Sequence, residues 1–315
     1  MTQATILREL SHGESLFYKA ALSNSAWSKI AGNIPVRVLQ ACLNVLIQKH
    51  AFLQCVVNEN DNNCYFTQRK TEEHIHQLEL LNQTALSYEQ QVHNYFQQTL
   101  NTSIDAQQTL IEVTCLRPSH NSADETYLVW RLSHIISDGI CLIDLHREFL
   151  SLCDQMLNIG GLVTRCSDSD NAIPACIESR LPSRSDGKTI EDMIESYLKV
   201  IDQAPHQILY PESAVSNGQH FQTEQHIEVI THRLSEPDTA AVLAWCKLRK
   251  LSFNDAFTAA LFLTAQRLTK QNTFLLRTAV NLRGKVEPAI DKNQVMTAAS
   301  SIITSTSIGK YEGKT

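Results

Sequence analysis

The spacing of apolar residues predicts three helices in the first half of the chain. Pro35, a residue suited to the first position of a helix, precedes an apolar face made of Leu39, Cys42, Leu43, Leu46 and Ile47. Ser87 with Gln90 three residues later is a capping-box pattern, which predicts a helix as far as Leu100. A third helix is expected from Gly139, with one side formed by Leu142, Leu145, Phe149, Leu152 and Met156.

Short apolar runs between these helices predict strands. Residues 52–57 and 64–67 are expected to pair across the turn at residues 61–63, which reads Asp-Asn-Asn. Residues 110–116 and 127–132 form two more apolar runs, separated by a polar loop. The first half of the chain therefore mixes helices and strands.

The composition changes after residue 160, where Gly, Ser and Pro become frequent up to residue 187. We place a domain boundary there and expect one domain over residues 1–172 and another over residues 173–315. The second half again alternates, with expected helices at 190–201 (capped by Thr189), 238–248 and 254–268, and expected strands at 227–234, 274–281 and 295–306. This pattern predicts an α/β or α+β fold in two domains.

Composition and charge narrow the classes of partner. The 315 residues are 43% hydrophobic and carry a net charge of −6 without a run of Lys and Arg, so we expect no nucleic-acid partner. No apolar stretch approaches the roughly 18 residues of a membrane span, and residues 1–10 lack the apolar core of a secretion signal. We therefore expect a cytoplasmic protein without integral membrane association. Its nine cysteines form no C-x-x-C pair and are expected to be reduced and mostly buried.

One segment carries candidate chemistry. The predicted strand 127–132 leads to His134, and Asp138 and Gly139 follow before the next helix. A histidine at the end of a buried strand is well held for use as a general base, and a glycine lets the backbone turn away. The alternative is a hydrogen-bonded core histidine, with Asp138 as a simple helix cap. We expect no metal site, because His74 and His76 have no third ligand nearby.

The segment also resembles the H-x-x-x-D-G signature of the chloramphenicol acetyltransferase-like superfamily, which includes condensation domains and polyketide-associated or alcohol acyltransferases. Similar landmarks occur in the family's order at residues 8–18, 48–53, 252–256 and 280–283. Ser133 stands where the family has the first histidine of a pair, which leans away from peptide-synthetase condensation domains and towards stand-alone ester-forming members.

The resemblance implies two related subdomains, each a mixed sheet flanked by helices, and roles for individual residues. His134 would be the general base, and Asp138 a structural support paired with Arg283 or, second, with Arg131. The Gly139 amide would donate to the developing oxyanion. Ser133, Ser137, Asn281 and Arg283 are the expected substrate-binding residues, although Arg283 is equally compatible with an ordinary surface position.

The same resemblance implies acyl transfer without a permanently bound cofactor. The donor would be acyl-coenzyme A or the acyl-pantetheine of an acyl carrier protein, and the acceptor a small alcohol or amine. Family members usually extend by roughly half a domain beyond the point that matches residue 315, so we expect the second subdomain to be incomplete. Two alternatives follow: an inactive or fragmentary relative that only binds an acyl carrier protein or acyl group, and a hydrolase in which His134 activates water.

Overall fold

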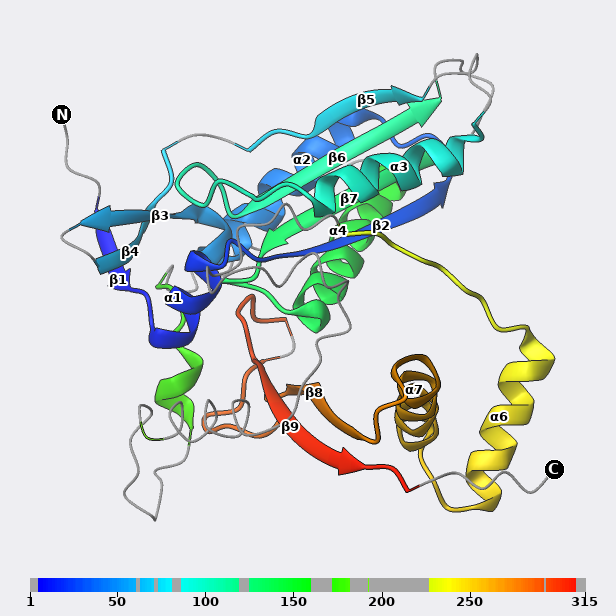
Figure 1. Ribbon diagram of the computed structural model, residues 1–315. Helices are drawn as coiled ribbons and strands as arrows, with labels where there is room; N and C mark the ends of the chain where they lie inside the picture. The colour runs from blue at the N-terminus through cyan, green and yellow to red at the C-terminus, as the bar shows by residue number, and fades with distance from the viewer. Residues whose placement is uncertain are drawn as a thin grey trace. The chain divides into compact units, whose positions relative to one another are not determined.

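The computed structural model divides the chain into two compact units (Figure 1). It describes residues 5–60, 63–70, 73–80, 86–118, 125–159, 172–181, 192, 227–291 and 293–309. Unit 1 comprises Met1–Pro182 and Asn281–Ala299, and unit 2 comprises Ser183–Val280 and Ser300–Thr315. The domain boundary expected at residue 172 stays a prediction, because residues 160–171 lie outside the described part.

Unit 1 is built on a four-stranded mixed sheet in the order β2-β7-β6-β5. Its strands are β2 (Ser23–Ala31), β7 (Glu125–Ser133), β6 (Ile111–Pro118) and β5 (His76–Leu80). The first three are antiparallel neighbours, and β5 runs parallel to β6. The predicted strands at 110–116 and 127–132 are confirmed. The pattern missed β2, whose alternating faces hold few large apolar side chains.

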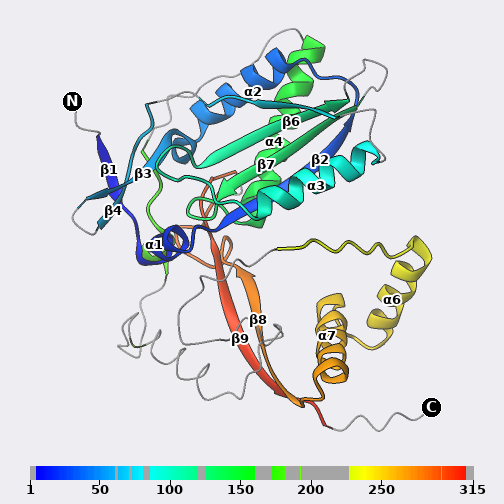
Figure 2. The ribbon, with the colours of Figure 1, turned by 45° about the horizontal axis from the view of Figure 1, so that its top comes forward.

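Helices cover both faces of this sheet (Figures 1 and 2). They are α2 (Val36–Lys49), α3 (Tyr88–Leu100) and α4 (Gly139–Ile159). Trp130 of β7 packs edge-on against Phe149 of α4, on the face that α2 also covers. On the opposite face, Tyr95 of α3 makes a hydrogen bond with Thr114 of β6. All three predicted helices are confirmed, including the Ser87 capping box.

A smaller sheet in the order β1-β4-β3 completes unit 1, with α1 and two 3-10 turns. The elements are β1 (Ile6–Glu9), α1 (His12–Lys19), η1 (Ala51–Gln54), β3 (Cys55–Asn60), β4 (Asn63–Gln68) and η2 (Ile177–Arg180). The expected strand at 52–57 begins only at Cys55, because Phe52 and Leu53 lie in η1. Both side chains are buried, and an apolar run does not by itself distinguish a buried turn from a buried strand.

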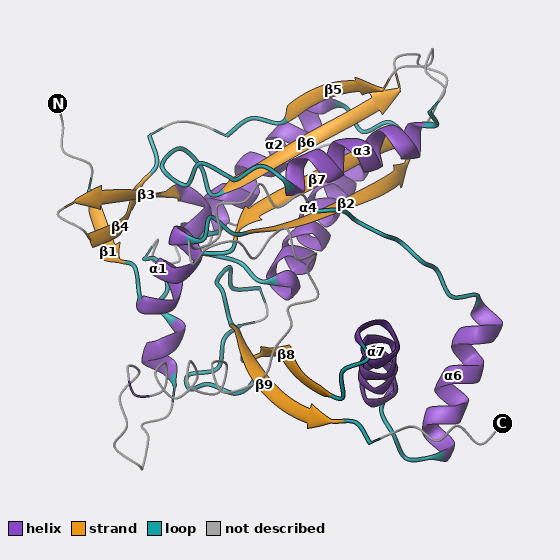
Figure 3. Ribbon diagram, in the orientation of Figure 1, coloured by secondary structure: helices purple, strands orange, loops and turns teal. Residues whose placement is uncertain are grey.

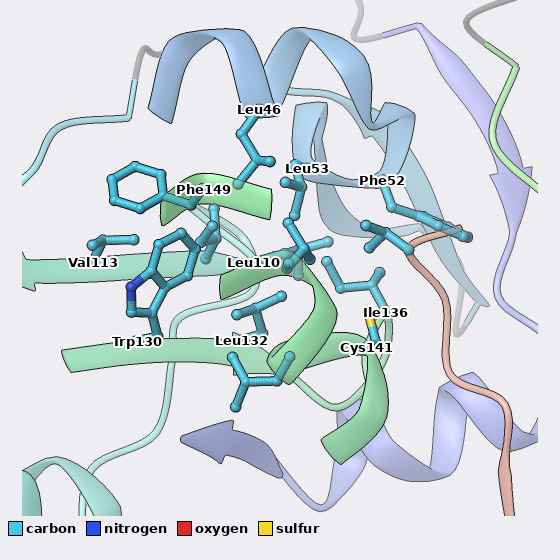
Figure 4. Packing of buried hydrophobic residues seen from close by; sticks show 14 of the residues in the cluster. Leu46, Phe52, Leu53, Leu110, Val113, Trp130, Leu132, Ile136, Cys141 and Phe149 are labelled. Carbon is cyan, nitrogen blue, oxygen red and sulfur yellow. The ribbon is translucent and has the colours of Figure 1, made fainter. Parts of the chain in front are cut away.

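The core of unit 1 is one continuous apolar cluster (Figure 4). In Figure 4, Trp130 of β7 lies beside Phe149 of α4, with Leu46 of α2 above them. The cluster also includes side chains from the distant segment 281–299, namely Val286, Ile290, Val295, Met296 and Ala298. This segment therefore belongs to the core of unit 1.

The described part of unit 2 includes the helices α6 (Glu236–Leu248) and α7 (Phe253–Thr269) and a sheet formed by β8 (Thr273–Asn281) and β9 (Ala299–Ser307) (Figure 3). The last residue of β8, Asn281, and the first residue of β9, Ala299, belong to unit 1. The expected strand at 227–234 is wrong: these residues form a loop, since an alternating pattern indicates an extended chain but does not by itself make a strand. The expected helix at 190–201 lies outside the described residues, apart from Asp192.

The mixed α/β class predicted from the sequence is confirmed by these two units. Among the described residues, no helix combines the length and the apolar character that a bilayer span needs. The described cysteines are free thiols, and six of them are buried.

Candidate functional site

His134 lies in the turn that follows β7, and its ring stacks on the ring of Phe17. The two ring centroids are 4.1 Å apart and the planes differ by 7°. The backbone N–H of His134 donates to the Leu22 carbonyl at 2.9 Å. Its Nδ1 is buried and has no hydrogen-bond partner among the described residues, whereas Nε2 is not among the buried unpartnered atoms. We take Nε2 as the nitrogen that a substrate can reach.

Phe17 is held in place by the anchoring of α1. Ser11 and Glu14 form a capping box at the start of this helix. Both Glu14 carboxylate oxygens accept hydrogen bonds from Arg8, each at 2.7 Å. The Glu178 carboxylate accepts from the Gly13 N–H at 2.8 Å and from the Ser11 hydroxyl at 2.9 Å. The segment around Glu178 therefore fixes the helix that carries the stacking ring.

Asp138 connects two separate parts of unit 1. Its Oδ1 accepts from the Cys141 N–H at 2.8 Å and so caps the first turn of α4. Its Oδ2 accepts from the Ala298 N–H at 2.9 Å and from Arg283 Nη2 at 3.2 Å. The Asp138 and Arg283 side chains are each only 7% exposed. The expected ion pair between them is confirmed, and it joins the turn after β7 to the segment 281–299.

Arg283 is buried, which excludes the alternative of an ordinary surface arginine. Nη1 donates to the Gln294 carbonyl at 3.0 Å, and Nη2 donates to the Met296 carbonyl at 2.7 Å. Arg131, the second candidate partner of Asp138, pairs with Glu112 at 2.6 Å instead. The substrate-binding role expected of Arg283 stays a prediction.

Thr297 was not identified from the sequence, although it holds the same turn. Its hydroxyl lies within hydrogen-bond distance of both the His134 carbonyl and the Ser137 carbonyl. More than 160 residues separate Thr297 from His134, so no local spacing could have revealed the contact. Asn24 adds a further donor, with Nδ2 at 2.7 Å from the Ser137 carbonyl.

The other expected binding residues lie in different surroundings. Ser137 is fully buried, and its hydroxyl donates to the Ser133 carbonyl at 2.9 Å, so its observed role is to hold the turn. Ser133 is buried but lines a cavity beside His134. Asn281 is exposed, and its Oδ1 accepts from the Arg283 N–H at 3.0 Å. Contact of any of these with a substrate stays a prediction.

The backbone conformation of Gly139 differs from the one that the sequence suggested. Its φ lies outside the left-handed region, so the backbone turn does not depend on a glycine here. A Cβ added at this position would have no heavy atom within 4 Å beyond its chain neighbours. The residue is exposed at the first position of α4, with open space beside it.

Cys141 and His74 are two further residues whose side chains can act as a nucleophile or a metal ligand. Cys141 is buried in α4, and burial raises the pKa of its thiol to about 11, which excludes a thiolate nucleophile near neutral pH. His74 is exposed, and the described residues contain no cluster of His, Cys, Asp and Glu suited to a metal ion.

A cavity of about 290 Å³ lies next to the candidate base, within unit 1. Its walls come from α1 and the residues after it, from the loop before β6, and from the neighbours of His134, Ser133 and Ile135. Phe17 contributes both to this wall and to the stack on His134. The site therefore combines a held imidazole, a buried ionic clamp and an adjacent space.

Comparisons with known proteins agree with this architecture. The profile of the condensation domain matches residues 8–169, and the profile described as phthiocerol/phthiodiolone dimycocerosyl transferase C-terminus matches residues 223–311. No curated protein matches the sequence.

Solved structures show the same fold at low identity. Polyketide synthase associated protein 5 from Mycobacterium tuberculosis is 16% identical with a TM-score of 0.65, over 99% of this chain and 70% of that one. The first condensation domain of the calcium-dependent antibiotic synthetase is 12% identical with a TM-score of 0.72, over 97% and 71%. The condensation domain of the Monacolin K polyketide synthase MokA is 15% identical with a TM-score of 0.62, over 97% and 69%.

The profile match covers more than half of the chain, and it includes the turn that holds His134, Asp138 and Gly139. The chain therefore belongs to the condensation-domain family of the chloramphenicol acetyltransferase-like superfamily, whose members are acyltransferases.

Proposed function

We propose that this chain transfers an acyl group from a thioester to the hydroxyl or amine of a small acceptor, with His134 as the general base. The donor is acyl-coenzyme A or the acyl-pantetheine of a carrier protein. The observation that supports this most directly is the clamp around the His134 turn, in which Asp138 binds Arg283 and the Ala298 N–H. A catalytic imidazole needs such fixed geometry, since small displacements of a reacting group cost large factors in rate.

In the proposed step, His134 Nε2 accepts the proton of the acceptor as its oxygen or nitrogen attacks the thioester carbonyl. The bond from the acyl carbon to sulfur then breaks, and the imidazolium returns the proton to the departing thiolate. The Gly139 N–H, at the first position of α4, is the proposed donor to the oxyanion. The open space beside Gly139 supports this role, because a substrate can approach the backbone there.

One observation favours the second candidate function, a relative that binds an acyl group or carrier protein without turning it over. For Nε2 to accept a proton, the neutral ring must carry its own proton on Nδ1, and no described residue accepts a hydrogen bond there. A buried N–H without an acceptor costs about 1–3 kcal/mol, which disfavours the reactive tautomer.

A thiol-release assay distinguishes the two functions. The wild type is mixed with a panel of acyl-coenzyme A donors and small alcohols and amines, and a blank without acceptor corrects for the protein's own thiols. His134→Ala should lower the transfer rate about 10²- to 10⁴-fold, the usual contribution of a general base. His76→Ala, at an exposed position of β5, is the matched control and should retain the rate. Transfer within a few-fold of wild type in His134→Ala contradicts the proposed base.

A further inference from the structure

The charged side chain in the lining of the cavity beside His134 is negative. Its lining includes Asp105 and contains no Lys, Arg or His. Asp105 accepts hydrogen bonds from two neutral donors, the Gln107 N–H at 3.0 Å and Gln108 Nε2 at 2.8 Å. No described cation forms an ion pair with this carboxylate. The exposed Asp105 carboxylate therefore has no ion-pair partner among the described residues and is free to bind a cationic ligand.

A second carboxylate stands close to the same wall. Burial raises the pKa of Tyr18, and a hydrogen bond to Glu59 raises it further, so the phenol stays protonated near neutral pH. Gln107 Nε2 reaches the Tyr18 hydroxyl at 3.5 Å. The polar part of the lining therefore combines the Asp105 carboxylate, which favours a ligand that donates hydrogen bonds, with the phenol of Tyr18, the amide of Gln107 and the hydroxyls of Ser103 and Ser133.

Apart from Ser103 and Ser133, the remaining lining is apolar and fits a ring or a short alkyl group. The apolar part is formed by Phe17, Ala21, Leu22, Ile104, Ala106 and Ile135. The volume of about 290 Å³ corresponds to about ten waters at roughly 30 Å³ each, and so to a ligand of about ten non-hydrogen atoms. The negative charge of Asp105 disfavours a coenzyme A phosphate in this cavity.

We infer that this cavity binds the acceptor and that the acceptor is a small amphiphilic amino alcohol. Its protonated amine lies at Asp105, its apolar part lies against Phe17 and Ile104, and its hydroxyl is the group acylated. The assignment of the ligand as the acceptor rests on the proposed function. The preference of the cavity for an organic cation is independent of catalysis.

Three probes with one skeleton and different charges test this preference. They are 2-amino-1-phenylethanol, the uncharged 1-phenyl-1,2-ethanediol and the anion mandelate, each titrated into the full chain and followed by NMR. The ring-proton signals of His134, assigned with His134→Ala, report occupation of the cavity because Phe17 contacts both. We expect the amine to bind more tightly than the diol, and mandelate to bind most weakly.

The variant Asp105→Asn removes the charge but retains an oxygen that can accept from the Gln107 N–H. It should weaken amine binding about two- to fivefold, as expected for a partly exposed ion pair, and leave diol binding unchanged. Asp144→Asn is the control, because Asp144 lies on α4 and pairs with exposed Arg147. A thermal melt shows whether both variants fold. Equal affinity for amine and diol in a folded wild type, or no effect of Asp105→Asn, overturns the inference.

The outcomes separate this inference from the proposed function. Tight, Asp105-dependent amine binding without acyl transfer supports the cavity assignment and contradicts the enzyme. Acyl transfer to uncharged alcohols that is indifferent to Asp105 supports the enzyme and contradicts the cavity assignment.

Discussion

The clamp at Asp138 predicts that Asp138→Asn strongly destabilises unit 1. Asp138 Oδ2 accepts two hydrogen bonds, from the Ala298 N–H and from the Arg283 guanidinium, while Oδ1 caps α4 through the Cys141 N–H. An asparagine has one oxygen, so either orientation of its amide leaves at least one of these buried donors facing an N–H group.

The magnitude follows from these contacts. With the Asn oxygen towards Arg283 and Ala298, the cap is lost, which costs about 1 kcal/mol; with the oxygen towards Cys141, the buried Arg283 donor loses this acceptor, which costs about 1.5–3 kcal/mol. In both orientations the Asp138 charge is removed and the buried Arg283 cation is left unpaired, so we expect a loss in the free energy of unfolding of about 3–5 kcal/mol, the range for breaking a buried ion pair. Asp144→Asn breaks an exposed pair on α4 and should cost less than about 1 kcal/mol.

The assay is urea unfolding followed by tryptophan emission in a Trp245→Phe background. The remaining tryptophans of the chain are then Trp27 and Trp130, both in unit 1. The double variant Asp138→Asn with Arg283→Met should lose less stability than the sum of the two single variants, because it removes the uncompensated buried cation. A loss below about 1 kcal/mol for Asp138→Asn, or strict additivity in the double variant, refutes the reasoning.

Two further predictions concern the first turn of α4. Gly139→Ala should leave the free energy of unfolding unchanged or raise it by about 0.4–1 kcal/mol, since the φ of Gly139 is ordinary and the added Cβ meets no other atom. If a substrate lies against Gly139, the thiol-release rate of this variant should nevertheless fall. An unchanged rate contradicts that contact. Native Cys141 should resist iodoacetamide at pH 8, since burial raises the pKa of its thiol to about 11 and only about a thousandth is thiolate at that pH. Peptide mass spectrometry should show labelling of half-buried Cys176 first and of Cys141 only on unfolding; rapid native labelling of Cys141 contradicts its assignment as an inert core thiol.

Much of the local structure of this protein is encoded in short stretches of sequence. Ser87 and Gln90 cap α3 through contacts within one turn, so their spacing is sufficient to predict the helix start. The H-x-x-x-D-G pattern likewise placed His134, Asp138 and Gly139 between a strand and a helix. These predictions hold because the interactions involved span only a few residues.

The sequence pattern was wrong at two expected strands of the second half. Residues 227–234 alternate like a strand but form a loop, and β9 begins at Ala299 rather than at Val295. Residues 295–298 are instead buried in unit 1, where Thr297 and Ala298 bind the turn of His134 and Asp138. Hydrophobicity shows that such residues are buried, but not which core receives them.

The sequence by itself determined the fold class, the start of the capped helix α3 and the identity of the candidate base. Only the tertiary structure decided that Phe17 stacks on His134, that Asp138 and Arg283 are buried together, and that Asp105 contributes an uncompensated charge to the neighbouring cavity. The physical reason is sequence distance. Periodicity and capping act within a few turns of the chain, whereas the environment of His134 is assembled from segments up to 163 residues away.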